Sequence, residues 1–283
     1  MRLRSLLFVP GDRPERFVKA AESGADAIIL DLEDSVSPAH KKSARAAVAD
    51  YLGGERSTFT LVRVNPLDSH FTAADIAAII NARPDAIMLP KAEGAASIAQ
   101  LDTLIRNEAQ DGASMPAILP IATETPQAIF TLGSYREVQD RLLGLSWGAE
   151  DLPASIGAAT AREEDGSYTA PYQVARSLTL FAAHGAGTAA IDTVFPAIKD
   201  VDGLALYAAR ARRDGFNGML AIHPSQIAPI NAAFTPSEAE LARAHAIVEA
   251  FAANPGAGVL QVDGKMIDAP HLKQARHILS QAD

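Results

Sequence analysis

The sequence contains no cysteine among its 283 residues. Disulfides, thiolate metal sites and cysteine nucleophiles are therefore excluded, and any site chemistry must come from oxygen and nitrogen groups. Long apolar runs are also missing, because no stretch of about 18 apolar residues occurs, so no transmembrane helix is expected. The apolar run Ser5–Pro10 is too short for the core of a signal peptide, and we expect a cytoplasmic protein.

An excess of positive charge is lacking as well. The formal net charge is −9 and the isoelectric point is about 5.3, so we expect no general binding to nucleic acid or to a membrane surface. What the chain does have is apolar material, at 48% hydrophobic and 21% charged residues. This composition is sufficient for one large α/β domain or two small ones.

Short apolar segments alternate with helix-like segments along the first 230 residues. The strands are expected at 4–10, 25–34, 59–66, 85–91, 116–124, 141–148, 189–196 and 218–224. Eight strand–helix steps fit a (β/α)8 barrel, usually of about 250 residues, better than a doubly wound open sheet. No G-x-G-x-x-G turn follows the first strand, which also disfavours the open sheet. We therefore predict an α/β protein whose residues 1–230 form a (β/α)8 TIM barrel.

Residues 231–283 lie outside the eight units. A helical pattern covers 237–256, and alternating residues around an Asp-Gly pair in 259–268 predict a hairpin. A final helix follows Pro270. We expect a C-terminal extension of helices and a hairpin that packs on the barrel or on a neighbouring subunit.

Polar residues gather where the predicted strands end. In a barrel of this type, chemistry occurs in the loops at the carboxyl ends of the strands. In chain order these residues are Asp12, Arg13, Asp31, Glu33, Asp34, Arg63, Asn65, Lys91, Glu93, Glu124, Asp151, Asp192 and His223. So many ionisable groups on one rim exceed what a fold requires, and the rim is the predicted active site.

Glu124 and Asp151 follow neighbouring strands of this barrel. Neighbouring strands lie about 4.8 Å apart, so both carboxylates can reach one cation with ligand distances of about 2.0–2.1 Å. Two carboxylates with open positions are typical of Mg²⁺, and no His or Cys pattern favours zinc. The alternative is that the two acids cap the helices that follow them.

Several ordered motifs carry a resemblance to a known family. The stretches LLFVPGDRPER, GADAIILDLEDSV, RVN, LPKAEG, IATETPQAI, GAEDL, AIDTVF, AIHPSQI and DGKMIDAPH resemble the citrate lyase beta-subunit-like branch of the HpcH/HpaI aldolase superfamily. This branch includes the malyl-CoA and citramalyl-CoA lyases. The resemblance spans nearly the whole chain. It implies a (β/α)8 barrel, usually trimeric or hexameric, that uses Mg²⁺ to cleave a 3-hydroxyacyl-CoA into acetyl-CoA and a 2-keto acid.

The resemblance also implies roles for individual residues. Arg63 would contact the substrate, with a salt bridge to Asp31 or Glu33 as its alternative. Asp268, after the letters GKM, would protonate the thioester enolate from a neighbouring subunit, and its alternative is an N-cap of the last helix. Asp31 and Glu33 would organise the groups that surround the substrate.

The basic residues leave more than one interpretation open. Lys91 sits at a strand end, where Schiff-base aldolases keep their amine, but a metal-stabilised enolate makes that mechanism unnecessary. We expect Lys91 to orient coenzyme A or carboxylates, or only to pair with Glu93. Arg13 and Lys19 could meet the phosphates of coenzyme A, or could belong to a solvated helix face.

One departure from the family pattern concerns Met219, which stands where many relatives have lysine. The motifs predict a lyase but do not distinguish citramalyl, malyl and citryl thioesters, which differ by small groups. Three alternatives remain open. The chain could be the beta subunit of a citrate lyase complex acting on a carrier-bound citryl thioester, a metal-dependent 2-keto acid aldolase that needs no coenzyme A, or a barrel that has lost catalysis.

Overall fold

The computed structural model describes residues 2–110 and 114–281. Contacts between Cα atoms divide the chain into two compact units. The larger unit is Leu3–Asn231, and the smaller unit is Ala232–Asp283 together with Met1–Arg2. Each unit has an apolar core of its own and is described by itself.

The larger unit contains eight parallel strands. They are β1 (Ser5–Pro10), β2 (Ala27–Asp31), β3 (Phe59–Arg63), β4 (Ala86–Leu89), β5 (Ala117–Pro120), β6 (Gly144–Ser146), β7 (Ala189–Asp192) and β8 (Gly218–Ala221). Their order is β5-β4-β3-β2-β1-β8-β7-β6. Only two isolated bridges, Ile118 with Leu142 and Ile121 with Ser146, join β5 to β6 and close the ring. The predicted (β/α)8 barrel is confirmed.

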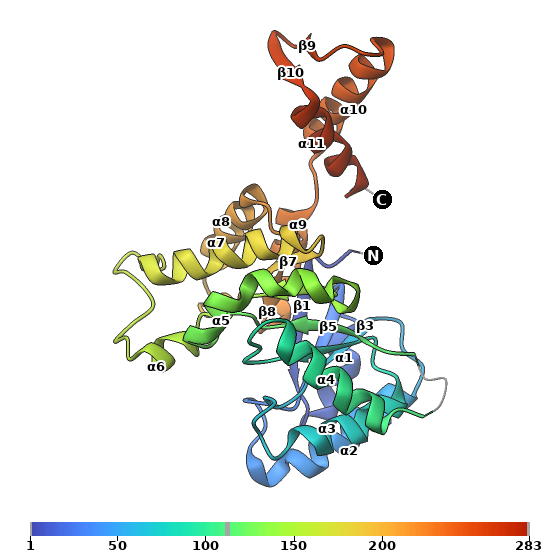
Figure 1. Cartoon of the computed structure of the whole chain (residues 1–283), viewed down its shortest axis with the longest axis vertical. Coiled ribbons are helices and arrows are strands. Elements are labelled where there is room, and N and C mark those ends of the chain that lie inside the picture. Colours follow the sequence, from blue (N-terminus) through green and yellow to red (C-terminus); the bar gives the residue numbers. More distant parts are fainter. Residues whose placement is uncertain (1, 111–113, 282–283) are drawn as a thin grey trace. The chain divides into compact units, whose positions relative to one another are not determined.

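Helices connect the strands on the outside of the barrel. The α-helices are α1 (Phe17–Ala21), α2 (Lys41–Gly53), α3 (Thr72–Ile79), α4 (Ala95–Glu108), α5 (Pro126–Thr131), α6 (Leu152–Ile156), α7 (Ala170–Gly185), α8 (Val201–Asp214) and α9 (Ile227–Phe234). Short 3₁₀ turns are η1 (Pro14–Arg16), η2 (Pro38–His40), η3 (Ile80–Ala82), η4 (Leu132–Arg141) and η5 (Pro224–Gln226). Helices α2, α3 and α4 lie side by side along one flank (Figure 1).

The interior of the barrel is filled by alternate strand residues. Leu6, Ile29, Leu61, Met88 and Leu119 belong to one buried cluster. Strands such as β2 are buried on both faces, because helices cover the outside, so they appear in the sequence as continuous apolar runs. The strands are shorter than the sequence predicted, because the polar residues after each apolar run leave the ladder and form the loops of the rim.

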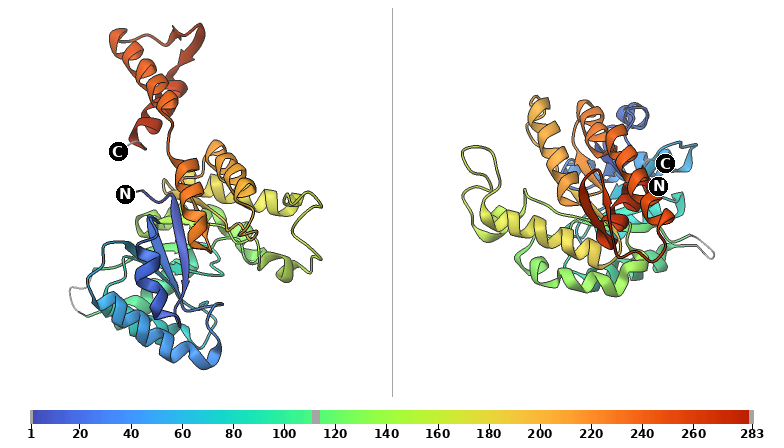
Figure 2. Two further views of the ribbon diagram at one scale, coloured as in Figure 1. Left: turned by 180° about the vertical axis from the view of Figure 1, so that it is seen from behind. Right: turned by 90° about the horizontal axis from the view of Figure 1, so that it is seen from above.

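The smaller unit contains α10 (Glu238–Ala253), β9 (Val259–Val262), β10 (Lys265–Asp268) and α11 (Ala269–Ser280), drawn in orange and red in Figure 2. Strands β9 and β10 form an antiparallel hairpin. Asp263 and Gly264 both have positive φ angles, of 50° and 74°, as a two-residue hairpin turn requires. The predicted helical and hairpin extension is therefore present. Within the described residues, no helix is both long and apolar enough to cross a membrane.

Candidate active site

A cavity of about 440 Å³ opens among the carboxyl ends of the barrel strands. One part of its wall is apolar and contains Phe8, Ile121, Trp147, Val194, Leu220 and Ile222. The other part is charged and contains Asp31, Asp34, Arg63, Glu124, Glu150 and Asp151. The cavity therefore combines an apolar surface with the acidic strand ends that the sequence identified.

Arg63 and Asp31 form an ion pair with two hydrogen bonds at this cavity. They end β3 and β2, and the parallel register sets them side by side. Arg63 Nε and Nη2 donate to the two carboxylate oxygens of Asp31, each at 2.7 Å. Burial alone would raise the pKa of Asp31, but the hydrogen bonds and charge of Arg63 hold it below its ordinary value. Beneath this pair, the ring of Phe8 lies 4.8 Å from the guanidinium carbon.

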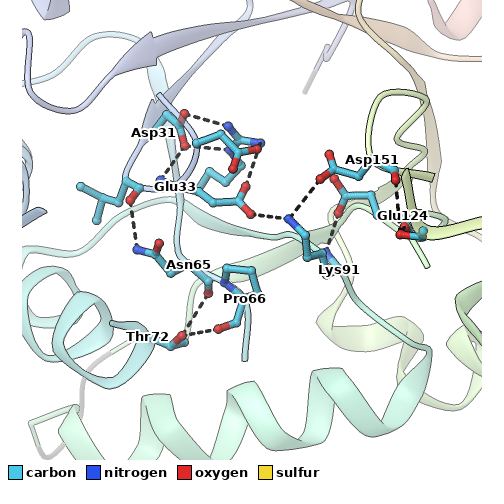
Figure 3. A network of polar contacts seen from close by, with 12 residues as sticks. Asp31, Glu33, Asn65, Pro66, Thr72, Lys91, Glu124 and Asp151 are labelled. Atoms are coloured by element: carbon cyan, nitrogen blue, oxygen red, sulfur yellow. Dashed lines mark hydrogen bonds and ion pairs between the residues drawn. The ribbon is translucent and has the colours of Figure 1, made fainter. Parts of the chain in front are cut away.

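Glu33 extends the pair into a network (Figure 3). Arg63 Nη1 lies 2.9 Å from Glu33 Oε2 and 3.8 Å from an oxygen of Asp34. Burial raises the pKa of Glu33 and outweighs the charge of Arg63 and the hydrogen bond from Lys91. The alternative expected for Arg63, a salt bridge to Asp31 or Glu33, is thus present with both acids. Hydrogen bonds to Asp31 use two of the five N–H donors of Arg63, while Glu33 Oε2 accepts no hydrogen bond, so N–H groups of Arg63 remain for a ligand.

Lys91 links Glu33 to the predicted metal ligands. Its φ angle is 51°, in the left-handed region that a residue with a side chain rarely adopts. The backbone N–H of Lys91 donates to Glu124 Oε2 at 2.5 Å. The Nζ atom donates to Glu33 Oε1 at 2.8 Å and lies 3.4 Å from Asp151 Oδ1 (Figure 3). The expected pairing with Glu93 is not found, because Glu93 accepts a hydrogen bond from Thr125 at 2.7 Å.

Glu124 is buried beyond the end of β5, with 3% of its surface exposed. Gly148 leaves room for it, because a Cβ atom at position 148 would lie 2.6 Å from Glu124 Cγ. Burial raises the pKa of Glu124 to about 8, with help from the negative charges of Glu33 and Asp151 and against the hydrogen bond from Lys91. Glu33, Glu124 and Asp151 therefore lie close enough together that the charges of Glu33 and Asp151 disfavour the charged form of Glu124.

Neither predicted metal ligand caps a helix with its side chain. Asp151 precedes α6 but makes no capping bond, and Thr125 supplies the cap of α5 through its hydroxyl. Among the described residues, Oε1 of Glu124 accepts no hydrogen bond, and the Asp151 side chain is about one third exposed. Both carboxylates line the cavity and have capacity for a cation.

Such a donor set fits Mg²⁺. Carboxylate oxygens are hard ligands, and Mg²⁺ sites keep positions for water and substrate. Within the described ranges, no three His, Asp or Glu side chains form a group that could hold a metal. The protein would therefore supply two ligands, and water and substrate would supply the others.

Lys41 is a part of the site that the sequence analysis missed. It is 6% exposed, and its Nζ donates to Leu32 O at 2.6 Å, to Glu33 O at 2.7 Å and to Asn65 Oδ1 at 2.8 Å. Burial lowers the pKa of Lys41 against several nearby acids. The ammonium thus holds the loop that carries Asp31 and Glu33. A signal existed, because Lys41 falls on the buried face of α2 with residues 44, 48 and 52.

Asp192 does not line the cavity, unlike Asp31, Glu124 and Asp151. Its carboxylate is fully buried and accepts from Trp147 Nε1 at 2.6 Å and from Tyr207 Oη at 3.1 Å. Arg176 donates to the same carboxylate at 2.8 Å. Since Trp147 lines the cavity, Asp192 fixes part of the apolar wall without reaching it.

Several other predicted positions do not line the cavity. Arg13 and Lys19 are exposed, and Arg13 Nε lies 3.9 Å from Asp12. Met219 is fully buried in β8, while the next residue in the strand, Leu220, lines the cavity. His223 is held by its own turn, with Nδ1 2.7 Å from Ser225 Oγ.

Asp268 belongs to the smaller unit and stands at the junction of β10 and α11. Its Oδ1 lies 2.5 Å from His271 Nδ1, and the two residues form a capping box at the start of α11. The N-cap expected as the alternative role is therefore present. About one third of the Asp268 side chain remains exposed, so one of its carboxylate edges is accessible.

An eight-stranded barrel whose carboxylates and arginine line a cavity at the strand ends has the arrangement of the barrel enzymes, in which chemistry occurs at this rim. Residues 4–224 match the sequence pattern described as HpcH/HpaI aldolase/citrate lyase. The chain belongs to this family and, within it, is a lyase of the citrate lyase beta-subunit-like branch.

Three relatives are informative. A citrate lyase subunit beta-like protein of Mycobacterium tuberculosis is 38% identical over 280 residues, which cover 98% of this chain and 94% of the relative. A (3S)-malyl-CoA thioesterase of Cereibacter sphaeroides is 34% identical, with coverages of 99% and 94%. The crystal structure of CitE from Mycobacterium tuberculosis, in complex with magnesium, acetoacetate and coenzyme A, superimposes with a TM-score of 0.83 at 36% identity and coverages of 99% and 97%.

Proposed function

We propose that the protein is a Mg²⁺-dependent carbon–carbon lyase that cleaves a short 3-hydroxyacyl-CoA of the citramalyl, malyl or citryl type. The products are acetyl-CoA and a 2-keto acid. The observation that carries the proposal is the convergence of Glu124, Asp151 and Arg63 on one cavity with an apolar wall. The similar CitE structure, described with magnesium, acetoacetate and coenzyme A, supports it.

Glu124 and Asp151 are the residues that would hold Mg²⁺. When bound, the ion supplies Lewis-acid chemistry that makes a substrate hydroxyl more acidic and stabilises the oxygen of the nascent keto group. The burial of Glu124 and its raised pKa support this assignment, because a cation relieves both the desolvation and the repulsion of the carboxylate.

Arg63 positions the acid end of the substrate. Its N–H donors that are not hydrogen-bonded to Asp31 can bind a carboxylate or the oxygen that becomes the keto group. Asp31 and Glu33 fix the guanidinium before the substrate arrives, so little reorganisation is needed during the reaction. Asp31 and Glu33 are positioning residues in this scheme.

Cleavage takes a proton from the hydroxyl group and returns a proton to the carbon of the thioester enolate, so the overall reaction is proton-neutral. We assign the return of the proton to Asp268, contributed by a neighbouring subunit of a trimer or hexamer. The exposed part of the Asp268 carboxyl and its fixed place beside His271 support this role.

Coenzyme A would contact both apolar and basic groups. The apolar wall, including Trp147 and Leu220, suits the acyl and thioester part of the substrate. Arg13 and Lys19 are exposed cations following β1 and are assigned to the coenzyme A phosphates. Lys91 is assigned to the carboxylates of the site, including those of the substrate.

The decisive experiment is a panel of citramalyl-CoA, malyl-CoA and citryl-CoA with Mg²⁺, in which release of the 2-keto acid is measured. We expect turnover of at least one thioester, loss of activity with EDTA, and a loss of at least 100-fold in kcat for Glu124→Gln and Asp268→Asn. Full activity in EDTA would contradict the metal assignment. Near-normal turnover by Asp268→Asn would contradict the assignment of the proton donor.

A second candidate is the beta subunit of a citrate lyase complex, because a similar relative is named citrate lyase subunit beta-like. The acyl group would then arrive on a carrier protein. Faster cleavage of carrier-bound citryl thioester than of citryl-CoA would favour this function. Turnover of free 2-keto acid aldols without coenzyme A would favour a simple aldolase.

A further inference from the structure

Lys91 touches three carboxylates at once. Its Nζ lies 2.8 Å from Glu33 Oε1 and 3.4 Å from Asp151 Oδ1, and its backbone N–H lies 2.5 Å from Glu124 Oε2 (Figure 3). Two of these acids are the metal ligands of the proposed function. Lys91 therefore places a positive charge beside Asp151 and its backbone N–H dipole beside Glu124.

The backbone of Lys91 adopts an unfavourable conformation to make these contacts. A φ angle of 51° lies in the left-handed region, which is sterically unfavourable for a residue other than glycine, asparagine or aspartate. This conformation lets the peptide N–H reach Glu124 while the side chain reaches Glu33 and Asp151. The contacts on both sides of the residue maintain the strained geometry.

Lys91 is the positive partner of carboxylates that Arg63 does not contact. Arg63 is committed to Asp31 and Glu33 by short contacts. Among the described residues, Lys91 is the one cation whose ion pairs include Asp151.

We propose that Lys91 is a built-in counter-ion, which holds Glu124 and Asp151 together in the metal-free protein and releases Asp151 when a divalent cation binds. This inference rests on the proposed function, because it takes Glu124 and Asp151 as the metal ligands. The ammonium and the metal compete for the same carboxylate. Lys91 therefore stabilises the empty site and weakens metal binding, so that the cation exchanges readily.

The test compares Lys91→Met with wild type, with Mg²⁺ alone as the probe. Removal of a unit positive charge a few ångströms from the site favours the binding of a cation, so we expect Lys91→Met to bind Mg²⁺ about tenfold more tightly in calorimetry. In EDTA, its unfolding temperature should fall below that of wild type. Added Mg²⁺ should raise that temperature more in the variant than in wild type.

Two further variants separate charge from other effects. Lys91→Gly loses the ammonium but accepts a positive φ angle without strain, so it should bind Mg²⁺ as tightly as Lys91→Met if charge is the cause. Lys42→Met removes an exposed cation from the same helix as Lys41 and should leave the Mg²⁺ affinity unchanged.

The outcomes distinguish this inference from the proposed function. If wild type binds Mg²⁺, and Glu124→Gln and Asp151→Asn abolish binding, the metal site stands. Equal or weaker Mg²⁺ binding by Lys91→Met and Lys91→Gly would then overturn the role of Lys91 alone. If Glu124→Gln and Asp151→Asn bind Mg²⁺ as wild type does, the metal assignment itself is overturned.

Discussion

Arg63 has five N–H donors, of which two are hydrogen-bonded to Asp31, and its Nη1 forms an ion pair with Glu33. This geometry leads to a prediction for Arg63→Lys. Lysine keeps the positive charge but lacks the planar fork, so it cannot hold Asp31 at two points and a substrate at the same time. We expect kcat/KM for the active thioester to fall by at least 100-fold in Arg63→Lys. The unfolding free energy of Arg63→Lys should differ from that of Arg63→Met by less than about 1 kcal/mol.

Steady-state kinetics of the two variants tests this prediction. Arg45→Lys is a matched control, because Arg45 pairs with Asp75 on the same barrel and does not line the cavity. An Arg63→Lys enzyme with kcat/KM within threefold of wild type would show that a simple charge is sufficient.

Glu124 leads to a prediction about pH. In the folded metal-free protein its pKa is about 8, whereas its ordinary value is 4.5, so the folded state binds more protons between these values. The stabilising contribution of protonated Glu124 is complete below about pH 4.5 and is lost as the pH rises through about 8. Each unit of pKa difference is worth about 1.4 kcal/mol, so a decrease of a few kcal/mol is the upper bound.

Urea unfolding in EDTA across pH 5–9 measures this loss of stability. Glu124→Gln, which cannot titrate, should show a smaller decrease over the same range. Glu33 also has a raised pKa and contributes in the same direction, so a residual slope is expected. A wild-type curve that is parallel to that of Glu124→Gln would contradict a raised pKa at Glu124.

Helix α2 influences the site through Lys41, although it lies outside the barrel. Lys41→Met would leave Asn65 Oδ1 without its donor, whereas Leu32 O keeps the hydrogen bond from Asn65 Nδ2 and Glu33 O keeps that from Val36 N. An unsatisfied buried acceptor costs about 1–3 kcal/mol, so we expect a destabilisation of about that size by urea unfolding. Lys42→Met, one residue further and exposed, should cost less than about 0.5 kcal/mol.

The part of the site that the sequence could predict lies at the strand ends. The carboxyl ends of parallel strands share one rim, so an apolar run followed by a charged residue was sufficient to place Glu124, Asp151 and Arg63 near one another. The partners of Lys91 could not be predicted in this way. Its contact with Glu33 joins residues 58 positions apart, and it depends on a left-handed backbone angle that no local pattern announces.

The direction in which a side chain at a strand end points could also not be predicted from the sequence. Asp192 and Asp151 look alike as acids after apolar runs, yet Asp192 faces Arg176 and Trp147, whereas Asp151 lines the cavity. Asp192 is the last residue of β7, whereas Asp151 lies beyond β6, at the start of α6. The apolar runs do not show where each strand ends and its loop begins, so the sequence could not separate the two positions.

At the scale of the whole molecule, the proposed exchange of Asp268 between subunits predicts complementation. Arg63→Lys subunits retain Asp268, and Asp268→Asn subunits retain Arg63. If one subunit supplies Asp268 to the site of another, mixed oligomers of two nearly inactive variants contain some complete sites. We expect co-expressed, doubly tagged oligomers to regain more than a tenth of wild-type kcat, as measured by keto-acid release.

The control is a mixture of the same two homo-oligomers without subunit exchange, which should remain inactive. A double variant carrying both substitutions in each subunit should also remain inactive when co-expressed with itself. Purified mixed oligomers with no recovered activity would contradict the contribution of Asp268 to a neighbouring site.

The way in which the barrel closes shows which two strands the proposed metal would connect. Strands β5 and β6 meet only through isolated bridges, with hydrogen bonds such as Leu143 N to Ile118 O and Ala122 N to Ser146 O. Glu124 follows one of these strands and Asp151 follows the other. A cation bound by both would link the two strands across the least hydrogen-bonded junction of the barrel. In its absence, the contacts of Lys91 with Glu124 and Asp151 are the link between the two loops.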